Sequence, residues 1–210
     1  LLPFHESGIE CSGSDYDERY LDYGRLKGLN LYLGDYSRHV ADDSVDLIIL
    51  SHVMEHFLDP ISEIQNLIMK IKPDGYLLVE VPGIYCIDSI YYDPLLYFQN
   101  AHIFNYYYCY LKTFFVQSGL EVIFGNERCT FILKKPKDWQ ARAINSIYDP
   151  ALSEYFEKIR KYIVITHWKY VFKLNPYQWR IKVVRILDSL GLKGPIKEIR
   201  NIIRNRSKLS

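Results

Sequence analysis

Residues 44–81 read SVDLIILSHVMEHFLDPISEIQNLIMKIKPDGYLLVEV, and this stretch decides the fold. Its first apolar run, Val45–Leu50, is short and rich in Ile and Leu, which predicts a strand buried on both faces of a parallel sheet. A helix is predicted to begin after Asp59, because Asp is a good N-cap and the next residue, a proline, suits the first helical position. Apolar residues then recur at helical spacing until the Pro-Asp-Gly sequence at 73–75 ends the helix. A second apolar run, Tyr76–Val81, follows at once.

A strand, a helix and a strand in so short a stretch form a βαβ unit, whose strands are parallel and whose crossover is right-handed. Upstream we expect a helix end closed by Gly8, a strand at Ile9–Ser12, a helix at about Glu18–Lys27 ended by Gly28, and a strand at Leu29–Leu33. Downstream we expect an irregular aromatic segment at Gly83–Phe104, a helix at Tyr106–Ser118, and strands at Leu120–Phe124 and Cys129–Leu133 that form a hairpin. The sequence therefore predicts an α/β fold with a mainly parallel sheet that ends in an antiparallel hairpin.

Charge is divided unevenly along the chain. Residues 158–210 hold 14 Lys and Arg against two acids, whereas the rest of the chain holds 12 basic and 23 acidic side chains. The Lys-Lys-Pro-Lys sequence at 134–137 marks a boundary. We therefore expect two modules, an acidic α/β domain at 1–137 and a basic helical extension at 138–210. Within the extension, the pattern predicts helices at about 150–174 and 176–206.

Composition excludes several classes of protein. No run of about 18 apolar residues occurs, so no membrane-spanning helix is predicted. Neither a signal peptide nor a recognisable nucleic-acid module is visible, and we expect no nucleic-acid partner. The four cysteines lie far apart without the spacing of paired ligands, which favours reduced thiols in a cytoplasmic protein. No feature of the sequence indicates a particular oligomeric state.

The extension interleaves aromatic and basic residues. The aromatic ones are Trp168, Tyr170, Phe172, Tyr177 and Trp179, and the basic ones are Lys161, Lys169, Lys173, Arg180, Lys182 and Arg185. Such helices can pack as a cap on the acidic domain or serve as an arm that docks a partner. They can also settle on an anionic membrane surface, where cations meet the head groups and aromatic rings enter the interface. A peripheral membrane contact through the basic tail is therefore an alternative to the cap.

Two segments carry a resemblance to a known family. DDSVDLIILSHVMEHFLDP at 42–60 and IKPDGYLLVEVPG at 71–83 resemble the middle of class I S-adenosylmethionine-dependent methyltransferases. The most similar branch has a strand ending in His-x-x-Glu-His, a Lys-Pro-Gly-Gly-like turn, and a strand ending near Val-Pro. The resemblance covers roughly residues 8–135. It implies a Rossmann-like methyltransferase fold and methyl transfer from S-adenosylmethionine to a small-molecule or glycan-like acceptor.

The resemblance also implies cofactor-binding residues. The Gly-Ser-Asp sequence ending at Asp15 matches the position of an acid that holds the ribose hydroxyls, and Tyr16 can pack against the sugar or the adenine. Asp35 matches an acid that accepts a hydrogen bond from the adenine amino group. The alternatives are a helix N-cap or a solvated acid for Asp15 and a turn-forming role for Asp35. Ser51 and His52 are implied to line the methionine end of the cofactor.

A polar cluster of Ser51, His52, Glu55 and His56 follows the strand at Val45–Leu50, at the strand end where open α/β sheets bind ligands. One interpretation, implied by the resemblance, is that Ser51 and His52 line the cofactor site, and a purely structural role of the cluster is a further alternative. A second makes His52 or His56 a general base, because imidazole exchanges protons near neutral pH. A third makes His52, Glu55 and His56 metal ligands, since one helical turn places all three on one face. We favour the first two interpretations and assign no metal ligand.

His102 lies just before the predicted helix at Tyr106–Ser118. The resembled family has a His-x-x-Phe-Ser-like sequence at this point, close to the substrate, and a capping or packing role is the alternative. We take His56 and His102 as the catalytic candidates. The aromatic segment Gly83–Phe104 is expected to shape the acceptor pocket.

The glycine-rich turn that binds the cofactor in this fold does not occur in the sequence. In the resembled family this turn follows a first strand that is central in the sheet. We therefore expect the chain to be the C-terminal part of a longer protein, to lack the first strand, and to bind the cofactor weakly or not at all. The alternatives are a non-catalytic binding or scaffold module and a different nucleotide-binding Rossmann enzyme.

Overall fold

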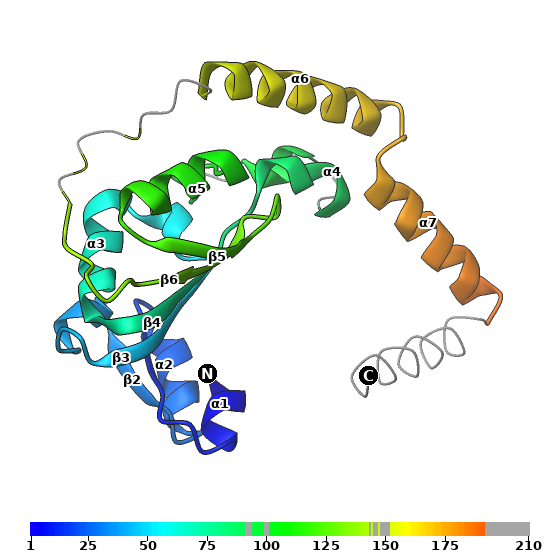
Figure 1. Ribbon diagram of the computed structural model, residues 1–210. Helices are drawn as coiled ribbons and strands as arrows, with labels where there is room; N and C mark the ends of the chain where they lie inside the picture. The colour runs from blue at the N-terminus through cyan, green and yellow to red at the C-terminus, as the bar shows by residue number, and fades with distance from the viewer. Residues whose placement is uncertain (91–93, 99–100, 143, 145–146, 148–151, 192–210) are drawn as a thin grey trace, which may run out of the picture.

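The computed structural model describes residues 1–90, 94–98, 101–142, 144, 147 and 152–191, and Figure 1 shows an α/β body followed by two helices. The strands are β1 (Ser12–Asp15), β2 (Asn30–Leu33), β3 (Val45–Ser51), β4 (Ile71–Glu80), β5 (Glu121–Gly125) and β6 (Thr130–Lys134). The α-helices are α1 (Leu2–Glu6), α2 (Glu18–Arg25), α3 (Pro60–Lys70), α4 (Ile87–Ile90), α5 (Tyr108–Gln117), α6 (Leu152–Val171) and α7 (Pro176–Ser189). Short 3-10 helices are η1 (Tyr36–Arg38), η2 (Met54–His56), η3 (Ile84–Cys86) and η4 (Pro94–Tyr97).

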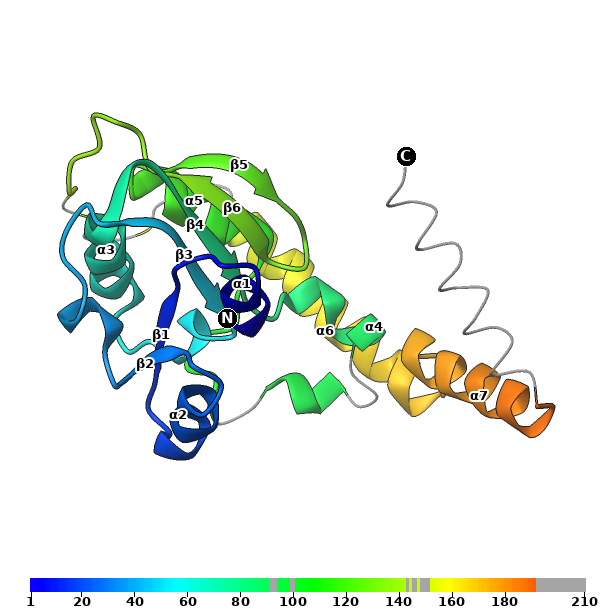
Figure 2. The same cartoon turned by 90° about the horizontal axis from the view of Figure 1, so that it is seen from below.

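The strands form two sheets. The larger has the order β3-β4-β6-β5, with β3 parallel to β4 and with β6 antiparallel to both of its neighbours. The smaller is the parallel pair β1-β2, which lies on the β3 side of the larger sheet in both views (Figures 1 and 2). The predicted fold, parallel strands followed by an antiparallel hairpin and a helical extension, is confirmed.

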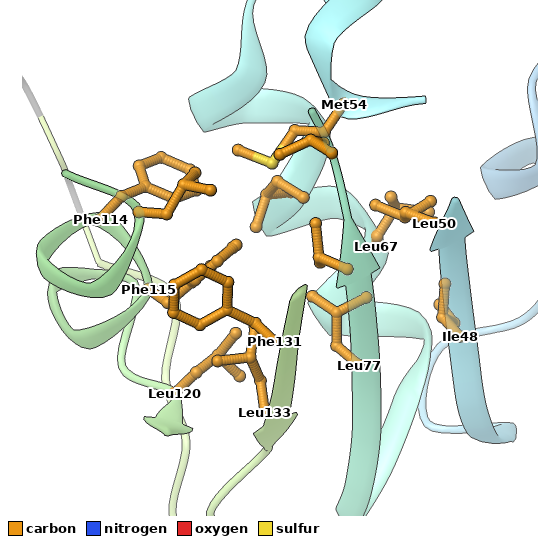
Figure 3. Close-up of a cluster of buried hydrophobic side chains, with 14 of the residues drawn as sticks. Ile48, Leu50, Met54, Leu67, Leu77, Phe114, Phe115, Leu120, Phe131 and Leu133 are labelled. Carbon is orange, nitrogen blue, oxygen red and sulfur yellow. The ribbon is translucent and has the colours of Figure 1, made fainter. Parts of the chain in front are cut away.

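The main core lies between one face of the larger sheet and the helices α3 and α5 (Figure 3). Strand residues such as Ile48, Leu77 and Phe131 meet Leu67 of α3 and Phe115 of α5 there. The prediction that β3 is buried on both faces is wrong. The alternate residues Leu47 and Ile49 stay 41% and 39% exposed, because β3 is an edge strand and its second face is only partly covered in the described part of the chain.

The first strand begins later than predicted. It spans Ser12–Asp15 rather than Ile9–Ser12. The amide of Ile9 donates to the carbonyl of Phe4 (3.0 Å), just after Gly8 with φ +76°, so Ile9 closes the turn that ends α1 instead of joining a sheet. Asp15 is therefore the last residue of a strand and does not follow it.

The strand β4 begins earlier than predicted, at Ile71, directly after α3. Its register against β3 shifts between Val45 and Leu47, so the Pro-Asp-Gly sequence at 73–75 lies inside the strand as an irregularity rather than in a separate turn. Gly75 is required here, since a Cβ would lie 3.0 Å from the carbonyl oxygen of Asp46. The helix end itself is where the sequence placed it, within a residue or two.

The segment Gly83–Phe104, predicted to be irregular, contains η3, α4 and η4. These turns form a second core in which Ile84, Ile87 and Tyr97 pack with Ile159 of α6. The extension thus rests on this segment. The helix predicted at 176–206 begins as α7 and ends at Ser189, and residues 192–206 lie outside the described residues. No helix in the described ranges combines the length and the apolar character needed to cross a membrane.

Candidate functional site

The carboxyl ends of β1 and β2 bring Asp15, Tyr16 and Asp35 together. Asp15 pairs with Leu33 across the two strands, and its carbonyl accepts from the amide of Gly34 (2.9 Å). The ring of Tyr16, which is 82% exposed, lies 3.9 Å from the position of a Cβ on Gly34. These three candidates therefore share one edge of the smaller sheet.

Asp15 is not the N-cap of α2. That role belongs to Asp17, whose carboxylate accepts from the amide of Arg19 (2.9 Å). The exposed carboxylate of Asp15 accepts one hydrogen bond through Oδ1, from the amide of Asp17 (2.8 Å). The N-cap alternative is wrong, and the carboxylate of Asp15 faces solvent at the end of its strand.

Asp35 forms the turn that begins η1. Its Oδ1 accepts from the amide of Ser37 and its Oδ2 from the hydroxyl of Ser37, both at 2.9 Å, and Arg38 Nε lies 3.3 Å from Oδ2. Burial raises the pKa of Asp35, but the hydrogen bonds from Ser37 and the charge of Arg38 outweigh it and leave the pKa below its usual value. A ligand amino group would share oxygens that the turn already uses.

Ser51 and His52 stand at the end of β3, where both side chains are exposed. The amide of His52 donates to the carbonyl of Glu80 (2.8 Å), and a φ of +55° then turns the chain away from the sheet. That left-handed turn is uncommon for a residue other than glycine. It directs the chain into η2, which carries Glu55 and His56.

Glu55 is buried beneath two histidines. Its side chain is 1% exposed, and its Oε1 lies 3.5 Å from His52 Nδ1 and 3.8 Å from His56 Nε2. Neither carboxylate oxygen has a hydrogen-bond partner within the described ranges. A buried carboxylate without a hydrogen bond is costly, so a further group is needed to satisfy it.

The segment 101–106 is tied to η2 by backbone hydrogen bonds. The amides of Ile103 and Phe104 donate to the carbonyl of Glu55 (3.0 and 3.2 Å). His56 Nδ1 lies 2.7 Å from the carbonyl of Ala101. These contacts bring His102 against His56, with the ring centroids 5.2 Å apart and the rings edge to face. Two histidines far apart in the sequence are thereby placed side by side.

The aromatic neighbour of this cluster stays neutral. Tyr106 is buried and reaches the carbonyl of Met54 with its hydroxyl at 3.5 Å. Burial raises the pKa of Tyr106 well above its usual value, and the charge of Glu55 adds to the effect. The cluster therefore offers imidazole and carboxylate groups for chemistry, without a phenolate.

The two groups of candidates belong to different sheets, and no ladder joins the sheets in the described residues. The turn η1 contacts α3, the helix that follows η2. Glu63 in the first turn of α3 has its pKa raised by burial and by the charges of Asp35 and Asp59. Asp35 therefore lies near the helix that follows the His-Glu-His cluster.

From the sequence, Glu55 is only one of three alternative metal ligands. Its burial between two histidines depends on the fold. The i, i+3, i+4 spacing was the available signal.

Two hollows lie along the extension, lined by residues such as Tyr170, Gln178 and Arg180, and they contain none of the predicted site residues.

Comparison with known proteins gives one family match. A family model described as a methyltransferase domain matches residues 3–124. No curated protein matches the chain.

Several solved structures are similar to this chain. A structure of the Haloferax volcanii Trm112 methyltransferase activator with its candidate methyltransferase has a TM-score of 0.51 and 14% identity, covering 63% of this chain and 73% of that one. An Archaeoglobus fulgidus S-adenosylmethionine-dependent methyltransferase has a TM-score of 0.49 and 23% identity, covering 76% and 72%. One from Mesorhizobium loti has a TM-score of 0.47 and 14% identity, covering 62% and 81%. At these identities the first of the three supports the fold alone.

Proposed function

The chain belongs to the methyltransferase domain family, and from this premise we propose that it transfers a methyl group from S-adenosylmethionine to a small-molecule or glycan-like acceptor. The single observation that carries the proposal of methyl transfer is the family match over residues 3–124, and the acceptor class rests on the resemblance described above. When bound, the cofactor supplies an activated methyl group. Transfer by in-line displacement then needs little from the protein beyond positioning of donor and acceptor.

The residues at the strand ends fit the cofactor. The exposed carboxylate of Asp15 offers an acceptor for two vicinal hydroxyls, and the exposed ring of Tyr16 offers a stacking face beside it. The carboxylate oxygens of Asp35 are already contacted by Ser37 and Arg38. We therefore propose that Asp35 helps to bind the cofactor mainly by shaping the turn and less by direct hydrogen bonds. Exposed side chains at the end of β3 are proposed to line the methionine part of the ligand.

We propose that a further parallel strand completes the sheet between β1 and β3. Among the described residues, β1 pairs only with β2 and β3 pairs only with β4. Leu47 and Ile49 of β3 are partly exposed. Parallel strands are normally buried within a sheet, so an unpaired edge on each of two parallel strands favours a further strand between them. A strand placed there would also supply a turn close to the ribose-binding candidates, and without it we expect weak cofactor binding.

The acceptor is proposed to approach the His-Glu-His cluster. A hydroxyl acceptor must lose its proton as the methyl group is transferred. Since a carbonyl only accepts hydrogen bonds, His56 Nδ1 donates to Ala101, and its Nε2 carries the lone pair. A proton taken by that nitrogen is stabilised by Glu55, whose Oε1 is 3.8 Å away. His102 is the second candidate for this role, at the edge of the aromatic segment proposed to shape the acceptor pocket.

The basic extension is proposed to have two faces. One face of α6 caps the body through Ile159 and Tyr162. The outer surface exposes Trp168, Phe172 and Trp179 among lysines and arginines, which supports peripheral contact with an anionic membrane surface. This contact would hold the enzyme, which we propose to be cytoplasmic, near a lipid surface.

The experiment is calorimetric titration with S-adenosylmethionine and with its demethylated product. It is done on this chain and on the protein extended by its upstream coding sequence. We expect weak binding to the first and tight binding to the second. If the extended protein binds neither compound, the enzyme proposal fails and the non-catalytic scaffold is supported.

A further inference from the structure

Three side chains from η2 and the segment 101–106 bring potential metal-ligand atoms close together. The carboxylate of Glu55 and the imidazoles of His56 and His102 each offer one ligand atom, and these atoms all lie within 4.8 Å of one another. Glu55 Oε1 and His56 Nε2 are 3.8 Å apart. This set differs from the triad expected from spacing, because His102 replaces His52.

A hydrogen bond of His56 determines which of its ring nitrogens faces Glu55. His56 donates its Nδ1 proton to the carbonyl of Ala101 (2.7 Å), so the neutral ring presents Nε2 as an acceptor. The carboxylate that it faces is 1% exposed and accepts no hydrogen bond from any described residue. Two acceptors that face each other repel unless a proton or a metal cation lies between them.

We propose that Glu55, His56 and His102 bind a divalent transition-metal cation of the zinc class. Around such an ion, bonds of about 2.0–2.2 Å place ligand atoms roughly 3.3–3.5 Å apart in a tetrahedral arrangement. The observed separations need only small side-chain movements to reach this geometry. Two imidazoles and one carboxylate favour Zn²⁺, Co²⁺ or Ni²⁺ over Mg²⁺ or Ca²⁺, which prefer oxygen ligands.

The surroundings support a metal site. A histidine ligand normally donates its second nitrogen to a carbonyl or carboxylate, and His56 does this with Ala101. The two amides that donate to the carbonyl of Glu55 hold the segment carrying His102 at a fixed distance. The ligands thus come from two segments fastened to each other by their backbones, which limits the entropy lost when an ion binds.

The site also has an open side. The side chain of His56 is 43% exposed, so the fourth position around the ion faces solvent, as in catalytic rather than structural zinc sites. Resting on the proposed methyl transfer, we infer that an acceptor hydroxyl takes this position. The cation would then lower the proton affinity of the hydroxyl, whose proton would leave to water at the open side. With the ion bound, His56 and His102 would hold the ion, and the ion would replace the general base proposed above.

The test is binding of the metal alone, without S-adenosylmethionine. Protein treated with a chelator is titrated with Zn²⁺ by calorimetry, and the visible absorption of added Co²⁺ is recorded. We expect one equivalent of either ion and the intense bands of a four-coordinate Co²⁺ site. A Co²⁺ spectrum no different from that of the hydrated ion overturns the proposal, whatever the activity.

Variants identify the ligands. Glu55→Gln and His102→Asn are each expected to weaken binding by at least the roughly 10–100-fold that loss of an outer partner costs a metal site. His167→Asn, an exposed histidine of α6 outside the cluster, is the matched control and should bind as the parent does. Circular dichroism shows whether each variant is folded. His102 is only partly buried, so we expect His102→Asn to fold and to test the site even if Glu55→Gln does not fold. Equal affinity in parent and His102→Asn contradicts the assignment, and it leaves the methyl-transfer proposal to the cofactor titration.

Discussion

The hydroxyl of Tyr162 in α6 lies 3.0 Å from Oδ1 of Asp88 in α4 and 3.0 Å from the carbonyl oxygen of Tyr85. Lys169, two turns further along α6, reaches the other oxygen of Asp88 at 3.4 Å. Together with the apolar contact of Ile159, these bonds attach the basic helix to the segment proposed to shape the acceptor pocket. The position of the extension and the shape of that segment are therefore coupled.

Replacing Tyr162 with Phe tests this attachment. The ring is kept and the hydroxyl is lost, so we expect docking of α6 to weaken by about 0.5–1.5 kcal/mol, the usual contribution of one hydrogen bond. Hydrogen exchange of the α6 amides measures the effect directly, and those of α3 should be unchanged. Tyr20→Phe, at a residue 70% exposed on α2, is the matched control. Equal exchange in parent and variant would show that Tyr162 does not hold the helix.

The same hydroxyl predicts a dependence on alkaline pH. Burial raises the pKa of Tyr162 to about 12, and the charge of Asp88 adds to this. Because the folded pKa lies above the value of about 10 in the unfolded chain, the stabilisation is complete below pH 10 and is lost as pH rises towards 12. Hydrogen exchange of the α6 amides is compared in the parent and in Tyr162→Phe between pH 10 and pH 12. The difference separates the ionisation of Tyr162 from that of the other tyrosines. Parallel curves would contradict the prediction.

Adjacent isoleucines on β3 test whether its second face is open. Ile48 is 6% exposed in the core, and Ile49 is 39% exposed on the opposite face. We expect Ile48→Ala to lower the free energy of unfolding by about 2–5 kcal/mol and Ile49→Ala by less than about 1 kcal/mol. Urea unfolding measures both. In the protein extended upstream, the cost of Ile49→Ala should rise toward that of Ile48→Ala, and an unchanged cost would argue against a further strand beside β3.

The βαβ unit was predictable because its signals are local. Asp59 caps α3 by accepting from the amide (3.2 Å) and the hydroxyl (2.6 Å) of Ser62, and the proline after it needs no partner for its nitrogen. The start of β1 was not predictable in this way. Whether Ile9 joins a strand depends on the carbonyl of Phe4, five residues earlier, which takes its amide. The prediction that β3 is buried on both faces failed for a related reason, since the burial of a strand depends on elements outside it.

Only part of the candidate site could be predicted from the sequence. The spacing of His52, Glu55 and His56 places them together without any tertiary information. His102 is held beside the cluster by two backbone hydrogen bonds to the carbonyl of Glu55, which is far away in the sequence. No local sequence pattern predicts these hydrogen bonds. Burial of Glu55, which turns a polar cluster into a candidate cation site, likewise follows from packing.

Contact of the extension with lipid is tested by removing two exposed rings. The double variant Trp168→Ser, Trp179→Ser should bind vesicles of phosphatidylcholine and phosphatidylserine on the order of tenfold less, because each ring contributes buried apolar area at the interface. Flotation of the vesicles measures the bound fraction. Binding should fall with added salt and be weak on phosphatidylcholine alone. Tyr23→Ser, exposed on α2, is the control, and equal flotation of parent and double variant would exclude a membrane contact through these rings.

The carboxylate of Asp15 gives the sharpest test of the cofactor site, since its exposed oxygen is not needed to cap α2. Asp15→Asn keeps the size of the side chain and one acceptor oxygen but removes the charge that strengthens hydrogen bonds from ribose hydroxyls. We expect affinity for S-adenosylmethionine to fall about ten- to a hundredfold in the extended protein, with little change in thermal stability. Asp22→Asn, a solvent-exposed acid of α2 paired with Arg25 at 3.2 Å, is the matched control for loss of one negative charge. If both variants lose the same affinity, the effect reflects net charge alone, and the assignment of Asp15 to the ribose is wrong.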